Sequence, residues 1–209
     1  MDTAEIIWTA PLEELLCNEA EKCSGLAWLH TKAEAYFSQR NNWLQIPVII
    51  LSTLTGFFSA GSESIFGPSG GGAFATGSVS ILVGILGTIN SYFSYAKRSE
   101  GHRLGSTQYS QIHRTLMIEM SLPREQRTPP KLLLKVVKDE LKRLAETLPR
   151  IPENIIEKYK KEIVPHSEGI QHPEITNGIH RVEPYSVLSK TFPTPEAEKP
   201  KVNIKIVPV

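Results

Sequence analysis

Histidines and cysteines are the residues of this chain that could ligate a metal or act in catalysis, so their spacing is the first test for chemistry. The chain has Cys17, Cys23 and histidines at positions 30, 102, 113, 166, 172 and 180, with no paired spacing typical of a metal site. The glycine run GPSGGGAF at 67–74 lacks the Lys-Ser/Thr of a phosphate-binding loop, and there is no Gly-x-Ser-x-Gly element. We therefore predict no catalytic, cofactor-binding or metal-ligating residues and expect a protein that is not an enzyme.

The distribution of charge is more informative than the average composition. The 209 residues are 40% hydrophobic and 22% charged, and the net charge of +1 argues against a partner bound through bulk charge, such as nucleic acid. Between Arg40 and Lys97, Glu63 is the only charged residue, whereas the average composition would place about 12 charges there. Depletion on this scale indicates an apolar solvent, which we expect to be a lipid bilayer.

Two apolar runs of equal length lie within this charge-poor segment, residues 41–96. The first is WLQIPVIILSTLTGFFSAG at 43–61 and the second is SVSILVGILGTINSYFSYA at 78–96, joined by the glycine-rich loop 62–77. About 20 helical residues cross a bilayer, so both runs suffice, and the short loop makes them antiparallel neighbours. Pro47 is expected near the start of the first helix, where it is tolerated. The alternative is a buried hairpin inside a soluble bundle.

Basic and aromatic residues at the ends of the two runs predict their orientation. Basic residues flank the runs on one side and the connecting loop has none, which places both termini in the cytoplasm. Tryptophan and tyrosine gather at membrane–water interfaces, and both occur at this same side. The predicted membrane-interface residues are Arg40, Trp43, Tyr92, Tyr95, Lys97, Arg98, His102 and Arg103.

Small residues repeat at spacings of three and four along the second run, and a shorter stripe follows the first. Such stripes let membrane helices approach closely. The predicted helix-packing residues are Ser52, Gly56, Ala60, Gly77, Ser80, Gly84, Gly87, Ser91 and Ser94. Two interpretations are open: the stripes meet inside one hairpin, or they meet between copies in a homo-oligomer whose serines and Asn90 line a pore. The absence of an ionisable residue from either run disfavours the pore.

Helical periodicity dominates the segments on both sides of the hairpin. Residues 1–40 are expected to form an amphipathic helix that runs directly towards the first span, and residues 97–163 a cytoplasmic helical region that continues the second. Their net charges of −4 and +6 favour packing of one segment against the other. The expected apolar stripes are Leu26, Leu29, Ala33 and Tyr36; Tyr109, Ile112, Leu116 and Met120; and Leu134, Val137, Leu141, Leu144 and Leu148.

The C-terminal segment, residues 164–209, is rich in proline and has no helical period. Such a composition is typical of chain that cannot build a core of its own. We expect an extended tail that is free to reach a partner protein.

The residues that follow the second run carry a family resemblance. The segment SYFSYAKRSEGHRLGSTQYSQIHRTL at 91–116 leaves an apolar helix through aromatics into Ala-Lys-Arg, and then continues with Glu, His-Arg, Tyr and a further Arg. It resembles the SLATT-type two-transmembrane proteins, especially the versions encoded by large DNA viruses of algae and protists. The stretch IPENIIEKYKKEI at 151–163 also looks like those viral versions, and the resemblance covers roughly residues 15–163.

The resemblance implies two functions. SLATT proteins of bacterial conflict systems are regarded as membrane-disrupting effectors that form pores on activation. In a large icosahedral virus with an internal membrane, a small two-span protein would instead tie the membrane to the capsid shell, and the Pro-rich tail suits that role.

We therefore predict an all-α membrane protein with a transmembrane hairpin, a cytoplasmic helical bundle and an extended tail. The favoured function is a structural or adaptor protein of the virion's inner membrane or minor capsid, with capsid or other assembly proteins bound through the tail. A SLATT-like pore-forming effector is the alternative.

Overall fold

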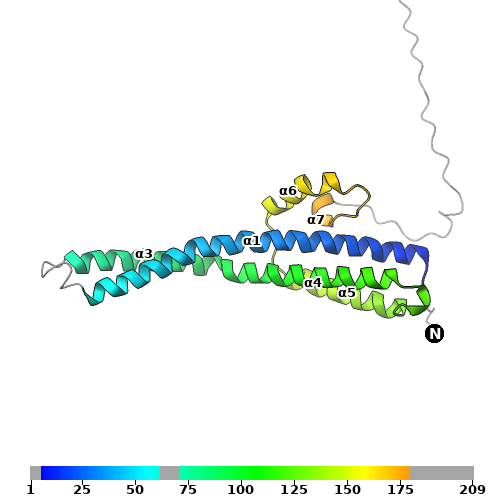
Figure 1. The fold of residues 1–209 in the computed structure, drawn as a ribbon, viewed down its shortest axis with the longest axis horizontal. Coiled ribbons are helices and arrows are strands. Elements are labelled where there is room, and N and C mark those ends of the chain that lie inside the picture. The colour runs from blue at the N-terminus through cyan, green and yellow to red at the C-terminus, as the bar shows by residue number, and fades with distance from the viewer. Residues whose placement is uncertain (1–5, 62–70, 179–209) are drawn as a thin grey trace, which may run out of the picture. The chain divides into compact units, whose positions relative to one another are not determined.

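Helices are the only regular secondary structure in the part of the chain that the structure, a computed structural model, describes: residues 6–61 and 71–178. The expectation of an all-α fold is confirmed for those residues. Figure 1 shows three long helices, followed by shorter elements. In chain order they are α1 (Ala10–Ala60), α3 (Gly71–Phe93), α4 (Tyr95–Ser121), the 3-10 turn η1 (Arg124–Gln126), α5 (Pro130–Thr147), α6 (Glu153–Glu162), the 3-10 turn η2 (Val164–His166) and α7 (Glu174–Asn177).

The first helix, α1, is unbroken over 51 residues. Pro11 lies in its first turn, where the backbone N–H would have no helical partner, and Glu13 lies at the positive end of the helix dipole. The amphipathic N-terminal segment therefore continues directly into the first apolar run. Pro47 lies deep inside this helix and not near its start, which corrects the sequence-based expectation, and it removes one backbone hydrogen bond there.

The second apolar helix, α3, is shifted relative to its predicted bounds. It begins at Gly71, so three glycines assigned to the loop, at positions 71, 72 and 77, are helical, and it ends at Phe93. The loop residues 62–70 lie outside the described residues. Ser94 then adopts a left-handed conformation, with φ 49° and ψ 43°, before α4 begins. The prediction of a helix continuing from 78–96 into the next segment is therefore wrong at Ser94.

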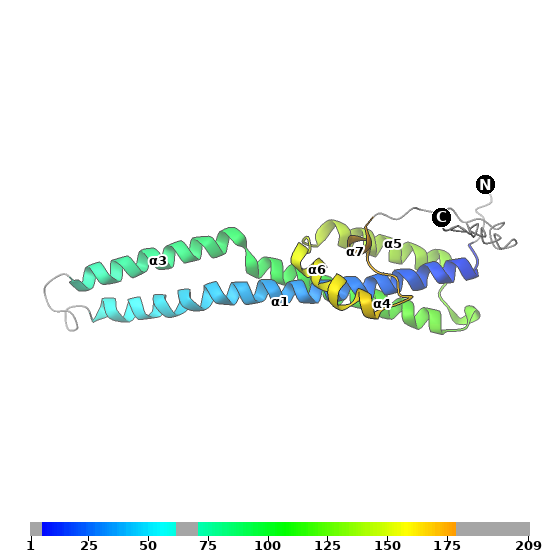
Figure 2. The same ribbon diagram turned by 90° about the horizontal axis from the view of Figure 1, so that it is seen from above.

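The main core lies where α1 packs against α4 and α5. In Figures 1 and 2, α1 runs alongside α3 and then α4, which follow each other in the opposite direction. The expected stripe on α4 is confirmed, and Leu133 of α5 is buried although it lies off the predicted stripe. The buried residues of this core are Leu16, Ala20, Cys23, Ala27, Tyr109, Ile112, Leu116, Leu133, Val137 and Leu144.

A second, smaller core joins another face of α1 to α6. It contains Leu29 and Ala33 of α1 with Ile155 and Tyr159 of α6. Gly25 is needed here, because a Cβ at that position would lie 2.7 Å from Pro173 and from the Tyr159 hydroxyl. Residues 164–178 thus fold onto the helices, which corrects the predicted start of the tail at residue 164. The remaining tail residues, 179–209, lie outside the described residues.

Ion pairs close the end of the bundle where α4 turns towards α5. The Glu13 carboxylate accepts hydrogen bonds from Arg124 at 2.8 Å and from Arg127 at 2.6 Å. Hydrogen bonds from both arginines lower the pKa of Glu13 to about 2. Arg127 also donates to the carbonyl oxygens of Leu122 and Met120, at 2.7 and 3.2 Å. The acidic N-terminal segment and the basic segment after the hairpin therefore meet here, as their charges predicted.

The two arginines provide a matched pair for testing this turn. The Arg127 side chain is 10% exposed and holds two backbone carbonyls, whereas the Arg124 side chain is 53% exposed and bonds only to Glu13. We expect Arg127→Met to lower the free energy of unfolding by about 1.5–3 kcal/mol, because it leaves two partly buried carbonyls and the Glu13 carboxylate without this donor. Arg124→Met should cost clearly less, since exposed pairs contribute little. Equal losses in denaturant unfolding would contradict this account.

Candidate functional site

The environment of α1 changes sharply along its length. The buried residues of α1 all lie between Leu16 and Phe37. Beyond them the helix presents large apolar side chains to its surroundings, such as Trp43, which is 74% exposed, and Phe57, which is 68% exposed. Two helices, one of them α1 and the other starting with α3, are long and apolar enough to cross a membrane, and their most apolar windows are 0% and 6% buried. We call the segments 43–60 and 71–93 the apolar arms.

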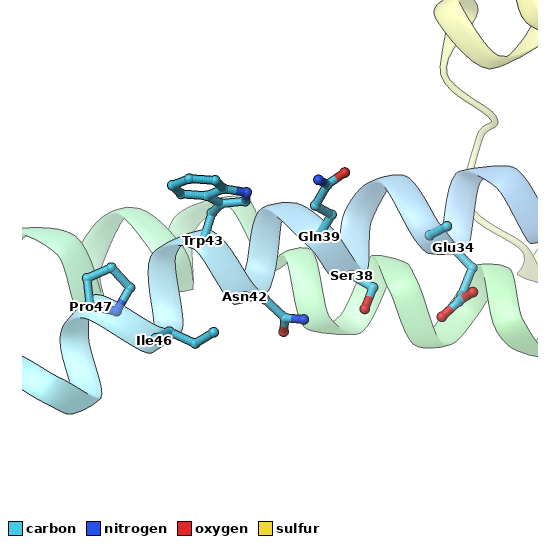
Figure 3. A pocket seen from close by; sticks show the side chains of 8 residues that line it. Glu34, Ser38, Gln39, Asn42, Trp43, Ile46 and Pro47 are labelled. Atoms are coloured by element: carbon cyan, nitrogen blue, oxygen red, sulfur yellow. The ribbon is translucent and has the colours of Figure 1, made fainter.

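A shallow hollow marks the boundary on α1 between the bundle and its apolar arm. It has a volume of about 640 Å³. Figure 3 shows its side chains changing along the helix from Glu34, Ser38, Gln39 and Asn42 to Trp43, Ile46 and Pro47. The lining of this hollow thus changes from polar to apolar within a few helical turns.

One hydrogen bond joins the two apolar arms near this boundary. The Asn90 side chain donates from Nδ2 to Oε1 of Gln45, at 2.9 Å. The single oxygen of this amide, Asn90 Oδ1, is buried and has no hydrogen-bond partner among the described residues. In apolar surroundings such a bond fixes the register of two helices, because separating them leaves polar groups unsatisfied. From the sequence, Asn90 was predicted only as a pore-lining residue, and Gln45 was not predicted.

The small-residue stripes do not pack within the hairpin. A Cβ built at Gly56, Gly77, Gly84 or Gly87 would meet no atom within 4 Å. The hydroxyls of Ser52, Ser80 and Ser94 are satisfied by carbonyls of their own helix or the helix just before. Ser91 and Ala60 are exposed. The interpretation that the stripes meet inside one hairpin is therefore wrong at these glycines, and packing between copies stays a prediction.

Seven of the eight predicted interface residues are exposed or half-buried in the structure. Trp43 and Tyr92 are highly exposed, at 74% and 82%. Tyr95 is half-buried because its ring stacks on Phe37. The basic residues are exposed: the Arg40 guanidinium covers the Tyr36 ring at 4.3 Å, Arg98 lies over Phe37 at 5.8 Å, Arg103 pairs with Glu100 at 2.6 Å, and Lys97 faces outward.

His102 departs from its predicted place at the membrane interface. It is completely buried between α1 and α4, with its ring stacked on Phe37 at 5.3 Å between centroids. Its Nδ1 lies 2.9 Å from Nδ1 of His30, which is 3% exposed. Burial, together with the charge of Arg98, lowers the pKa of His102 to about 4; burial, together with His102, lowers the pKa of His30 to about 4. The neutral forms are thus favoured.

His30, Phe37 and Gln45 were missed by sequence reasoning because their partners lie on another helix. His30 lies one position beyond Leu29 of the predicted stripe, which left it without an assigned role. Its contact with α4 needs Gly105, since a Cβ there would lie 2.7 Å from His30 Nδ1. A glycine in the middle of a polar helix was the one available signal.

The described residues contain no group of three or more His, Cys, Asp or Glu side chains arranged to hold a metal ion. Cys23 lies in the main core, where burial raises the pKa of its thiol to about 12, so the thiolate nucleophile is not formed near neutral pH. No family model, curated protein or solved structure matches the chain. Inference about function therefore starts from the geometry alone.

The bond between Gln45 and Asn90 can be measured by a double-mutant cycle. We expect Gln45→Leu and Asn90→Leu each to destabilise the paired arms, because each leaves the remaining amide without its partner. The double variant should lose less than the sum of the two, with a coupling free energy of about 1 kcal/mol in denaturant unfolding of detergent-solubilised protein. Additive losses would show that the two amides do not interact.

Proposed function

We propose that this chain is an integral membrane protein that acts as a structural anchor or adaptor, with the apolar arms crossing a bilayer and the bundle held at one membrane face. One observation carries the proposal: the most apolar windows of the two long helices are 0% and 6% buried. The core helix of a soluble protein would bury such a window, whereas a lipid solvent removes the cost of exposing it. The alternative of a buried soluble hairpin is disfavoured for that reason.

The lengths of the arms agree with a crossing. The α1 arm, residues 43–60, spans about 27 Å at 1.5 Å per residue, and α3 is slightly longer than the hydrocarbon core of about 30 Å. Trp43 and Tyr92, both exposed, lie at the bundle end of the two arms and suit the membrane–water interface. The Gln45–Asn90 bond would lie just inside that interface.

The orientation follows from the basic residues at the bundle end. Arg40 on α1 and Lys97, Arg98 and Arg103 on α4 are all exposed there. The connection between the arms carries no basic residue. By the positive-inside rule the bundle and both termini face the cytoplasm.

Several side chains of the bundle that could act in catalysis are buried, which favours an adaptor role over catalysis. The buried histidines hydrogen-bond to each other, and burial raises the pKa values of Cys23 and Tyr109. The bundle also presents apolar side chains outward on α5, where Leu132 and Val136 are 53% and 52% exposed. A partner protein gains binding energy by covering such residues. Capsid or other assembly proteins, bound here and through the tail beyond Gly178, are the partners we propose for a virion inner membrane.

A chain without the tail tests membrane anchoring by the arms separately from partner binding by the tail. We expect a chain that ends at Gly178 to stay in the membrane fraction after alkaline extraction, because both arms are intact. In the native membrane or particle, crosslinking with mass spectrometry should join the full-length tail to a different, abundant protein, and the truncated chain should lose that protein in a pull-down. Release of the full chain by alkaline extraction would refute the anchor, and retention of every partner after truncation would refute the adaptor.

A SLATT-like pore formed by several copies is the second candidate, and the open stripe on α3 favours it. Because a Cβ at Gly84 or Gly87 meets nothing in the hairpin, Gly84→Leu with Gly87→Leu should leave the fold intact and block close approach of another copy. We expect this double variant to abolish ion leakage from liposomes. Ile85→Leu with Ile89→Leu, at exposed positions of the same helix, is the control that should leak as the parent does. Absence of leakage in the parent would exclude the pore.

A further inference from the structure

The buried pair His30 and His102 has no role in the proposed function and is unusual inside a small helical core. The two side chains are 3% and 0% exposed, and their Nδ1 atoms lie 2.9 Å apart. The pair joins α1 to α4 in the first turns after the apolar arms. Phe37 stacks on His102 and on Tyr95, which directly follows the left-handed Ser94.

The hydrogen bond between the imidazoles restricts which nitrogens carry protons. One Nδ1 must donate and the other must accept, so the neutral pair has one proton between these two atoms. His102 Nε2 is buried with no hydrogen-bond partner. A buried acceptor without a partner costs less than a buried N–H, so we assign His102 as the Nδ1 donor and His30 as the acceptor. A proton added at His102 Nε2 would create a charged donor with nothing to bind.

The groups around the pair give an added positive charge no compensation. From α4, the Arg98 guanidinium lies over the Phe37 ring and Tyr109 lies 5.5 Å from the His30 ring. His30 also lines a cleft of about 560 Å³ between α1, α4, α5 and the segment around α7. The titratable side chains lining that cleft are Glu19, Lys22 and Cys23 from α1, Tyr109 from α4, Arg150 after α5 and Glu174 from α7.

The carboxylates of this cleft are already engaged. Lys22 donates to Glu19 at 2.8 Å and to Glu174 at 3.4 Å. Helix α6 contributes only Ile156 to the lining, and α5 contributes apolar side chains. Burial and the positive charges nearby therefore both act against a protonated pair.

We propose that the pair is a proton-operated latch: neutral His30 and His102 hold α1 against α4 at the base of the apolar arms, and proton binding releases that contact. Above pH 6.5 both imidazoles are neutral in the closed and the open state, so protons do not affect the latch. Below pH 6.5 the open state binds protons first, because its histidines are solvated. Closed-state pKa values of about 4 set the lower limit of the window.

The size of the effect follows from proton linkage. Between about pH 6.5 and pH 4, each histidine shifts the closed-to-open ratio about tenfold per pH unit towards the open state. Two histidines acting together make the dependence steeper. The ion pairs of Glu13 at the other end of the bundle persist over this window, because the pKa of that carboxyl is about 2.

Hydrogen exchange of the full chain in lipid nanodiscs tests the latch, with rates corrected for the intrinsic effect of pH. We expect the segments 24–37 and 98–109 to lose protection by about tenfold or more per pH unit below pH 6.5, while residues around Glu13 and Arg127 keep theirs. Protection that is constant down to pH 4.5, or an equal loss across the whole bundle, would overturn the proposal.

Variants of the pair assign the effect to its histidines. His102→Phe preserves a ring against Phe37, and with His30→Gln it should flatten the pH dependence. The control is His113→Gln on α4, whose Nδ1 bonds to the Ala20 carbonyl at 2.9 Å and which should respond to pH as the parent does. A flat response in this control, or the parental response in the double variant, would refute the assignment.

A titration of isotopically labelled histidine gives a readout on the parent protein that does not depend on any variant folding. Two imidazoles should protonate well below pH 6.5, together with the loss of protection in 24–37. Ordinary midpoints near pH 6.5 for all six histidines, with the fold intact, would overturn the latch.

Discussion

Both halves of this molecule depend on the continuity of α1. A helix of 51 residues is not stabilised by propensity alone, since most helical stability in proteins comes from packing of an apolar face. The N-terminal half of α1 packs against α4 and α5 on one side and against α6 on another, so it belongs to both cores. The second half of α1 continues the same helix and needs no separate N-terminus. The packing around Leu16 and Leu29 thus fixes the direction in which the apolar arm leaves the bundle.

In the proposed membrane arrangement α1 passes from water into lipid, which a helix can do because its backbone groups are satisfied internally. In a lipid solvent an exposed N–H or C=O costs several kcal/mol, and a helix exposes almost none. Only the side chains must change, and on α1 they change between Glu34 and Trp43. Pro47 is the exception, since it leaves one carbonyl without its helical donor. It lies just beyond the boundary, close to Gln45 and its bond with Asn90.

The sequence predicted what depends on periodicity and charge, and failed where two distant segments meet. The α4 stripe of Tyr109, Ile112 and Leu116 followed from spacing alone and is buried. His102 was misplaced because its environment is set by His30, 72 positions away, and by the approach that Gly105 allows. The glycines at the start of α3 were assigned to a loop on propensity, which the pairing of α3 with α1 overrides.

The break at Ser94 distinguishes the two helical paths that lie side by side. One path, α3 followed by α4, is interrupted at Ser94, whereas the other, α1, is continuous. A left-handed serine costs about 1–3 kcal/mol, so the surrounding packing must hold it in place. The rings of Phe93 and Tyr95 stack across the break, with 5.3 Å between their centroids. The Tyr95 ring also stacks on the Phe37 ring of α1. Helix α1 is unbroken where it lies beside Ser94. The helical path paired with α1 is therefore interrupted at Ser94, close to the contact of His102 with α1.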